Sequence, residues 1–210
     1  MGKTLQRKRI KVCGIRNLED ALVASSAGAD ALGFVFYGPS PRNVELAEAA
    51  DIIAALPAFV TSVALFVDPE PAWVEAVVAE TAVDLLQFHG EETGDFCRSF
   101  SRPYIKALRV RPDADIAAQA ACYPDARAIL LDSYVQGIPG GTGVRFDWSL
   151  IPLGLKQPIV LAGGLTPENV GEAAGQPGIW GLDVSGGVEE RKGIKSPALI
   201  ESFCKGVNGG

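Results

Sequence analysis

The fold is decided by Leu182-Asp183-Val184-Ser185-Gly186-Gly187-Val188-Glu189 and by the similar stretch Leu161-Ala162-Gly163-Gly164-Leu165-Thr166-Pro167-Glu168-Asn169 before it. Each is a short apolar run that ends at two adjacent glycines. Thr166 is a suitable N-cap and Pro167 suits the first position of a helix, so we expect a helix to begin directly after the earlier stretch. Glycine lets the backbone approach a ligand closely, and the N–H groups at a helix start bind anions.

The two glycine turns together predict a phosphate site. Either turn alone is equally consistent with a phosphate site and with an ordinary tight turn. In many (β/α)8 barrels, however, the turns after the seventh and eighth strands hold a phosphate group. The residues that we expect to bind it are Gly163, Gly164, Ser185, Gly186 and Gly187.

The rest of the chain repeats the same alternation of short apolar runs and longer helical ones. The pattern predicts strands at 10–15, 31–37, 62–67, 83–88, 104–110, 127–132, 158–162 and 179–184. Helices are expected at 17–27, 44–56, 69–80, 91–100, 114–122, 146–150, 167–174 and 197–207, with a glycine-rich loop at 137–143. Eight such units predict a single-domain α/β protein, a (β/α)8 TIM barrel. The alternative is an open doubly wound sheet, but no G-x-G-x-x-G motif follows the first strand.

Composition limits the class of partner. The chain has 210 residues, of which 48% are hydrophobic and 21% charged, enough for one domain with a sizeable core. A net charge of -6 argues against a nucleic-acid or membrane-surface partner, because both attract basic proteins. No apolar run reaches the roughly 18 residues of a membrane helix, so the cytoplasm is the expected location.

The cysteines and the N-terminus carry little functional signal. The single histidine and the absence of any C-x-x-C pair argue against a metal site, and the cysteine spacing does not suggest a disulfide framework. The cysteines are Cys13, Cys97, Cys122 and Cys204. Residues 1–9 are polar and basic without an apolar run behind them, so we expect a loose tail before a catalytic domain at 10–210.

Polar residues at the predicted strand ends are the candidates for chemistry. Lys11 and Cys13 lie two apart on the first strand, so both face the barrel interior while Ile10 and Val12 face the helices. An adjacent ammonium would lower the pKa of Cys13 and make it a base, although a free cysteine is more often a small buried hydrophobe. Asp132 closes the sixth strand, where a carboxylate is costly unless it is paired or active; a turn residue is the alternative.

Three further side chains are expected to contact a ligand. Asp183 closes the eighth strand, and His89 shares a face with Gln87 at the end of the fourth. Arg42 stands on a proline-stiffened loop and is suited to a bidentate pair with a carboxylate, though it is equally consistent with a solvated surface arginine. A phosphate site beside a possible base and acid suggests proton transfer on a phosphorylated sugar.

These residues resemble the phosphoribosylanthranilate isomerase family of tryptophan biosynthesis. The matching stretches, in family order, are Lys11-Val12-Cys13-Gly14-Ile15, Gly33-Phe34-Val35-Phe36, Ser40-Pro41-Arg42, Gln87-Phe88-His89-Gly90, Leu131-Asp132-Ser133, Gly140-Gly141-Thr142-Gly143, Phe146-Asp147-Trp148, Leu161-Ala162-Gly163-Gly164-Leu165 and Asp183-Val184-Ser185. The resemblance implies the Amadori rearrangement of N-(5-phosphoribosyl)anthranilate to 1-(2-carboxyphenylamino)-1-deoxyribulose 5-phosphate, without a cofactor.

The resemblance also implies a role for each residue. Asp132 matches the general acid, Cys13 the general base, and Arg42 the group that holds the anthranilate carboxylate. Lys11, His89 and Asp183 would contact the substrate. The chain departs from the family at Gly186, where a serine is usual, so we expect backbone N–H groups to hold the phosphate with somewhat weaker binding.

Three other functions remain open at this point. A two-substrate isomerase that also serves histidine biosynthesis would need a second glycine-rich turn, which residues 66–69 lack. An aldolase would form a Schiff base on Lys11 or Lys106, and a non-catalytic binder would need neither Cys13 nor Asp132. No feature of the sequence settles the oligomeric state; a monomer is the default and a homodimer the alternative.

Overall fold

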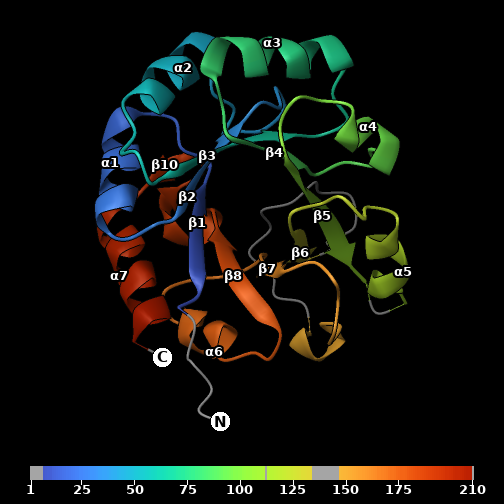
Figure 1. The fold of residues 1–210 in the computed structure, drawn as a ribbon. Helices are drawn as coiled ribbons and strands as arrows, with labels where there is room; N and C mark the ends of the chain where they lie inside the picture. Colours follow the sequence, from blue (N-terminus) through green and yellow to red (C-terminus); the bar gives the residue numbers. More distant parts are fainter. Residues whose placement is uncertain (1–6, 112, 134–146, 210) are drawn as a thin grey trace.

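Eight parallel strands close into a barrel, which confirms the predicted fold. The computed structural model describes residues 7–111, 113–133 and 147–209. The strands are β1 Arg9–Cys13, β2 Ala31–Val35, β3 Thr61–Phe66, β4 Leu85–Phe88, β5 Tyr104–Val110, β6 Ile129–Ser133, β7 Ile159–Leu161 and β8 Ile179–Val184. Each pairs with the next in chain order, and β8 pairs with β1, so the sheet has no open edge (Figure 1). This closure rules out the open doubly wound sheet.

Helices surround the strands, as Figure 1 shows. They are α1 Leu18–Ser26, α2 Leu46–Ala54, α3 Pro71–Thr81, α4 Gly94–Arg98, α5 Ile116–Ala121, α6 Val170–Ala174 and α7 Pro197–Asn208. Two 3-10 turns, η1 Trp148–Leu150 and η2 Gly186–Val188, follow β6 and β8. The predicted loop at 137–143 and residues 1–6 of the predicted tail lie outside the described residues. None of the helices in the described ranges is both long and apolar enough to cross a bilayer.

A short hairpin after β8 was not predicted. Its strands are β9 Glu189–Arg191 and β10 Ile194–Lys195, paired antiparallel. Strands of three and two residues are too short to show a period in the sequence. The hairpin matters because it brings Lys195 back to the end of the barrel.

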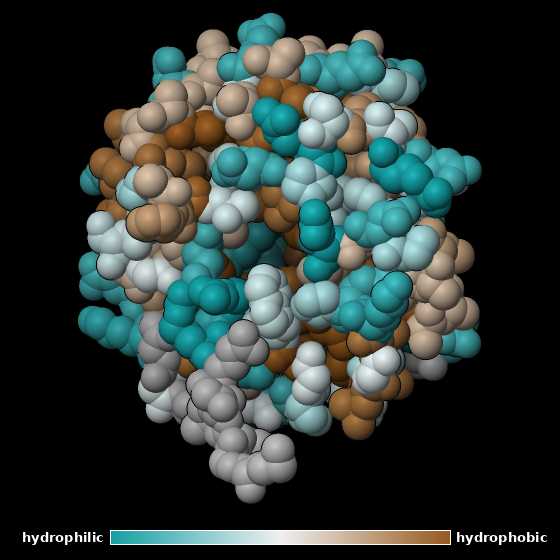
Figure 2. Space-filling view, in the orientation of Figure 1, coloured by the Kyte–Doolittle hydropathy of each residue, from teal (hydrophilic) through white to brown (hydrophobic). Residues whose placement is uncertain are grey.

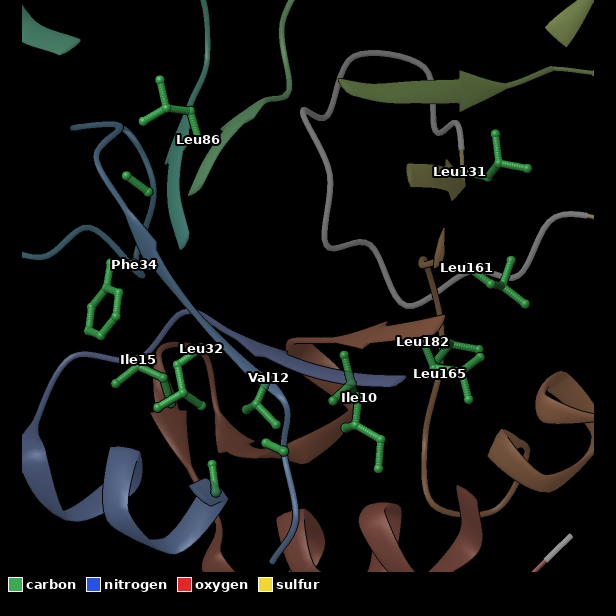
Figure 3. Close-up of a cluster of buried hydrophobic side chains, with 14 of the residues drawn as sticks. Ile10, Val12, Ile15, Leu32, Phe34, Leu86, Leu131, Leu161, Leu165 and Leu182 are labelled. Carbon is green, nitrogen blue, oxygen red and sulfur yellow. The ribbon is translucent and has the colours of Figure 1, made fainter. Parts of the chain in front are cut away.

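The core has two layers because each strand buries both faces. Ile10 and Val12 belong to the large outer cluster between strands and helices, and Figure 3 shows their side chains on that side. A smaller cluster fills the barrel itself; it consists of Ile105, Ala107, Ala128, Leu130, Val160 and Ala162. Lys11 and Cys13 alternate with Ile10 and Val12, so they face the interior as predicted.

The outer surface is mostly polar where it can be seen in Figure 2, with apolar side chains between the polar ones.

At the start of the barrel, Arg7 and Arg9 pair with Asp30, and Lys8 donates to the carbonyl of Ile179. The first strand, β1, begins at Arg9, one residue before the predicted boundary.

Candidate active site

Lys11 and Asp183 form a buried ion pair across the β1–β8 junction. The parallel register places the two residues side by side, and Lys11 Nζ lies 2.9 Å from Asp183 Oδ1. Their side chains are only 7% and 8% exposed. Burial would lower the pKa of Lys11, but attraction to Asp183 and Cys13 outweighs it, so the pKa is raised. Lys11 is therefore a fixed cation beside Cys13.

Cys13 lies beside this pair and is 4% exposed. Burial raises the pKa of its thiol, while the Lys11 ammonium lowers it, and burial is the larger cause. Lys11 thus lowers the pKa of Cys13 as expected, but burial outweighs this effect and the net shift is upward. Burial also raises the pKa of Cys97 to about 12 and that of Cys204 to about 11, as for inert core thiols.

Asp132 is held by two donors at the end of β6. Its Oδ1 accepts from the Ser133 N–H at 2.9 Å, and its Oδ2 lies 3.0 Å from His89 Nε2. Gln87 Nε2 lies 3.0 Å from the other ring nitrogen, His89 Nδ1. With the Gln87 amide donating to Nδ1, the ring proton sits on Nε2 and is donated to Asp132. The structure thus brings His89 and Gln87 together with the predicted acid.

The close approach of β7 to Asp132 requires glycine at position 163. Gly163 has φ +81, and a Cβ there would lie 2.7 Å from Asp132 Oδ1 and 2.5 Å from the Ser133 nitrogen. Both facts exclude a side chain without movement of the acid. The predicted phosphate turn is therefore in direct contact with the predicted acid.

The two glycine turns pack against each other. A Cβ on Gly187 would lie 1.8 Å from the carbonyl oxygen of Leu165, so the second turn lies directly on the first. Within the described ranges, no group accepts a hydrogen bond from the N–H of Gly164, Gly186 or Gly187. Such N–H groups are the kind of donor that the predicted phosphate site requires.

The helix after the first turn begins later than predicted. It starts at Val170 rather than at 167, and residues 167–169 form a turn. The Asn169 side chain accepts from the Thr166 N–H and donates to the Gly164 carbonyl. Asn169 therefore uses its amide to brace the glycine turn, and α6 is only five residues long.

Arg42 is not a solvated surface arginine. Its Nε lies 2.7 Å from Glu189 Oε1 and its Nη2 lies 2.9 Å from Glu189 Oε2, a bidentate pair. Its side chain is 12% exposed, and the hydrogen bond with Glu189 raises its pKa. The same side chain lies against Gly186, where a Cβ would be 3.2 Å from Arg42 Nη2.

Two residues of this region were not predicted from the sequence. The sequence pattern indicates no role for Glu189 or Lys195, yet Lys195 Nζ donates to Glu189 Oε1 at 3.0 Å and to the Ser185 carbonyl at 3.0 Å. The only available signal is the Arg191-Lys192-Gly193 sequence, which is typical of a hairpin turn.

Lys106 is engaged elsewhere. It is 1% exposed, its Nζ lies 2.8 Å from Glu92 Oε2, and it donates to the Gly90 carbonyl. Lys11 is likewise paired. A Schiff-base lysine needs an uncharged, accessible amine, so these contacts argue against the aldolase alternative. Among the described residues, no group of three or more acidic, histidine or cysteine side chains is placed to hold a metal.

Comparison with known proteins identifies the family of this chain. Residues 10–206 match the family N-(5'phosphoribosyl)anthranilate (PRA) isomerase. The chain is 57% identical over 199 residues to the N-(5'-phosphoribosyl)anthranilate isomerase of Pseudomonas fluorescens strain SBW25, covering 95% of each. It is 55% identical to that of Pseudomonas aeruginosa strain LESB58, covering 95% of this chain and 94% of the relative.

Solved structures agree as well. The phosphoribosyl anthranilate isomerase of Thermotoga maritima superimposes with a TM-score of 0.88 at 40% identity, covering 96% of this chain and 99% of that one. A second isomerase structure, in complex with reduced 1-(o-carboxyphenylamino)-1-deoxyribulose 5-phosphate, gives 0.84 at 39% identity over 96% and 99% of the two chains. This chain therefore belongs to the N-(5'-phosphoribosyl)anthranilate isomerase family.

Proposed function

We propose that Cys13 and Asp132 are the base and the acid of the isomerase reaction. The reaction is the Amadori rearrangement of N-(5-phosphoribosyl)anthranilate to 1-(2-carboxyphenylamino)-1-deoxyribulose 5-phosphate, an intramolecular aldose–ketose isomerisation in L-tryptophan biosynthesis. The observation that carries the assignment is the placement of the pair: both residues end strands of the barrel, and Asp132 touches the glycine turn suited to phosphate.

Asp132 starts the reaction as a general acid. It gives a proton to the ribose ring oxygen, the C1′–O bond breaks, and the nitrogen lone pair forms an iminium. His89 Nε2, at 3.0 Å from Asp132 Oδ2, keeps the carboxyl group in place by a hydrogen bond. The Ser133 N–H fixes the other oxygen.

Cys13 completes the reaction as a general base. Its thiolate removes the proton from C2′ of the iminium, which gives an enolamine, and the enolamine tautomerises to the ketone. Lys11 stabilises the thiolate from the same face of β1, while Asp183 balances the charge of Lys11. No cofactor is needed, because every step moves a proton.

The two anionic ends of the substrate are held apart from the reacting carbons. Arg42 faces the anthranilate carboxylate, with Glu189 fixing its guanidinium plane. The N–H groups of the turns at 163–164 and 185–187 hold the phosphate, and Gly186 contributes its N–H without the hydroxyl of the usual serine.

The decisive experiment is the loss of anthranilate fluorescence with freshly generated phosphoribosylanthranilate. Cys13→Ser and Asp132→Asn should each lower kcat by about 10²- to 10⁴-fold, because each removes one proton transfer, while the circular dichroism spectrum stays native. Lys192→Met, on the exposed hairpin turn, is the matched control and should keep the wild-type rate.

Other outcomes would reassign the site. An active enzyme whose Cys13→Ser variant is unimpaired would move the base elsewhere, with Asp183 as the next candidate. If the wild-type protein did not convert this substrate, the acid–base assignment would be contradicted, and other sugar phosphates would be tested as substrates.

We also propose that the chain works as a monomer in the cytoplasm, with a homodimer as the alternative. One solved relative consists of monomers generated from the dimeric isomerase of Thermotoga maritima. Phe59, Leu153 and Trp180, at 100%, 72% and 41% exposed, are among the large apolar side chains that a second copy could cover. Sedimentation velocity over a range of protein concentrations distinguishes the two states.

A further inference from the structure

The hairpin after β8 carries a lysine that the reaction does not use. The antiparallel register of β9 and β10 places Lys195 opposite Glu189. The side chains of Lys195 and Glu189 are 0% and 4% exposed, so the pair is withdrawn from water. A buried ammonium is costly, and it persists only where its partners compensate for lost hydration.

Lys195 has partners on both sides. One is Glu189 Oε1, at 3.0 Å, and the same carboxylate receives both Nε and Nη2 of Arg42. The other is the Ser185 carbonyl, also at 3.0 Å, with the Ser185 hydroxyl at 3.4 Å. Lys195 is thus the only described residue that hydrogen-bonds both to the carboxylate behind Arg42 and to the turn at 185–187.

The charges in this cluster support a role in alignment rather than in chemistry. Burial lowers the pKa of Lys195, and attraction to Glu189 opposes that effect. Burial alone would raise the pKa of Glu189, but Arg42 and Lys195 outweigh it, so this carboxyl stays ionised. The Lys195 ammonium contacts Glu189 Oε1 and both the carbonyl and hydroxyl oxygens of Ser185, which suits a group that holds these residues in place.

We propose that Lys195 is a positioning residue that sets the separation between the Arg42 guanidinium and the turn at 185–187. This inference rests on the proposed function and deepens it. A ligand with a carboxylate at one end and a phosphate at the other then binds to two groups whose separation is already fixed in the free protein. Such preorganisation strengthens binding without new contacts to the ligand.

The prediction is a change in binding with little change in chemistry. Lys195→Met keeps an unbranched apolar side chain but removes the ammonium, so Arg42 and the turn lose their common anchor. KM for phosphoribosylanthranilate and the dissociation constant of reduced 1-(o-carboxyphenylamino)-1-deoxyribulose 5-phosphate should both rise about 10- to 100-fold. Because the Lys195 charge also helps to lower the pKa of Cys13, kcat is compared over a pH profile, and its alkaline plateau should stay within about threefold.

The matched control is Lys192→Met, which removes the same charge from the exposed turn of the same hairpin. It should leave KM, kcat and the dissociation constant unchanged. A double-mutant cycle with Arg42→Ala tests the link directly: the double variant should bind the reduced product more tightly than the product of the two single effects predicts.

Three results would overturn the proposal. They are an unchanged KM in Lys195→Met, a loss confined to kcat, and fully independent effects of Arg42→Ala and Lys195→Met. Should Lys195→Met fail to fold, Glu189→Asp makes the same test, since it keeps the charge but withdraws the carboxylate from Arg42 by one methylene. If wild type is inert toward phosphoribosylanthranilate, the proposed function fails, while the affinities for the reduced product still decide the role of Lys195.

Discussion

Gly163 keeps the space beside the Asp132 carboxylate free of side chains. In Gly163→Ala, the new methyl group would lie 2.7 Å from Asp132 Oδ1, and the residue would also keep φ +81. The acid must move, and we expect kcat to fall by at least about tenfold, because a small misplacement of a catalytic group is costly. The measurement is the fluorescence assay at saturating substrate.

Gly154→Ala is the control for backbone strain. Gly154 has φ +86, but no atom lies within 4 Å of the position that a methyl group would take, so this variant carries the strain without the clash. Both variants should lose about 1–2 kcal/mol of stability from the left-handed backbone, yet only Gly163→Ala should lose activity. Equal rates in the two variants would show that the contact with Asp132 does not matter.

The buried thiol of Cys13 makes the pH dependence informative. A cysteine acts as a base only as thiolate, and a raised pKa means that the thiolate fraction is small at neutral pH and grows as pH rises. In Asp132→Asn the acid is gone, so the remaining kcat/KM should follow the thiolate alone. We expect it to rise about tenfold per pH unit between about pH 7 and pH 9.

The double variant Cys13→Ser/Asp132→Asn should show no such slope. A level profile in Asp132→Asn itself would mean that Cys13 is not the base, or that its thiol is already ionised at neutral pH.

The place of Cys13 on the interior face was predictable, because alternation along a strand is regular. The lowering effect of Lys11 on the pKa of Cys13 was predicted but the net upward shift was not, because the adjacent charge is visible in a sequence and the degree of burial is not.

The segment between β4 and α4 is held by one buried ion pair. Glu92 accepts from the N–H groups of Asp68 and Gly90, and Lys106 donates to both Glu92 and the Gly90 carbonyl. This segment includes His89, the partner of Asp132. The side chains of Lys106 and Glu92 are 2% and 3% exposed, so neither charge has water to replace a lost partner.

Glu92→Gln should therefore cost about 3–5 kcal/mol of stability, because it leaves the Lys106 ammonium buried without a counter-charge. Urea unfolding gives the value from the midpoint and slope. Glu91→Gln, one residue away, is the control: Glu91 is 84% exposed and 4.0 Å from Arg109, so its loss should cost less than about 0.5 kcal/mol. Equal midpoints for the two variants would contradict the stabilising role of the pair.

The secondary structure was predictable where burial on two faces leaves a continuous apolar run. This is why all eight strands were found, and β5 was found with its bounds at Tyr104–Val110. Helix starts were less predictable: α6 begins at Val170 because the Asn169 side chain bonds backward to the turn instead of capping forward. The ion pair of Arg42 with Glu189 joins residues 147 positions apart, and no local pattern reports such a contact.

The barrel as a unit should respond to its ligand. The proposed contacts come from β1, β2, β6, β7 and β8, so one bound molecule joins loops from most of the circumference. Reduced 1-(o-carboxyphenylamino)-1-deoxyribulose 5-phosphate at 100 times its dissociation constant should stabilise the fold by about 2.7 kcal/mol, seen as a higher Tm. The Arg42→Ala variant should need a higher ligand concentration for the same increase in Tm. A wild-type Tm that does not change when the ligand is added would argue against the proposed site.

The pairing of β8 with β1 has a consequence for how the enzyme comes into being. Lys11 and Asp183 meet across 172 positions, and the Ser185 hydroxyl reaches back to the Cys13 carbonyl over the same separation. A nascent chain that has emerged only as far as β7 carries its thiol but lacks the counter-ion of Lys11 and half of the phosphate cradle. If the proposed site is correct, catalytic competence is gained in one step near the end of synthesis, when the last strand closes the ring.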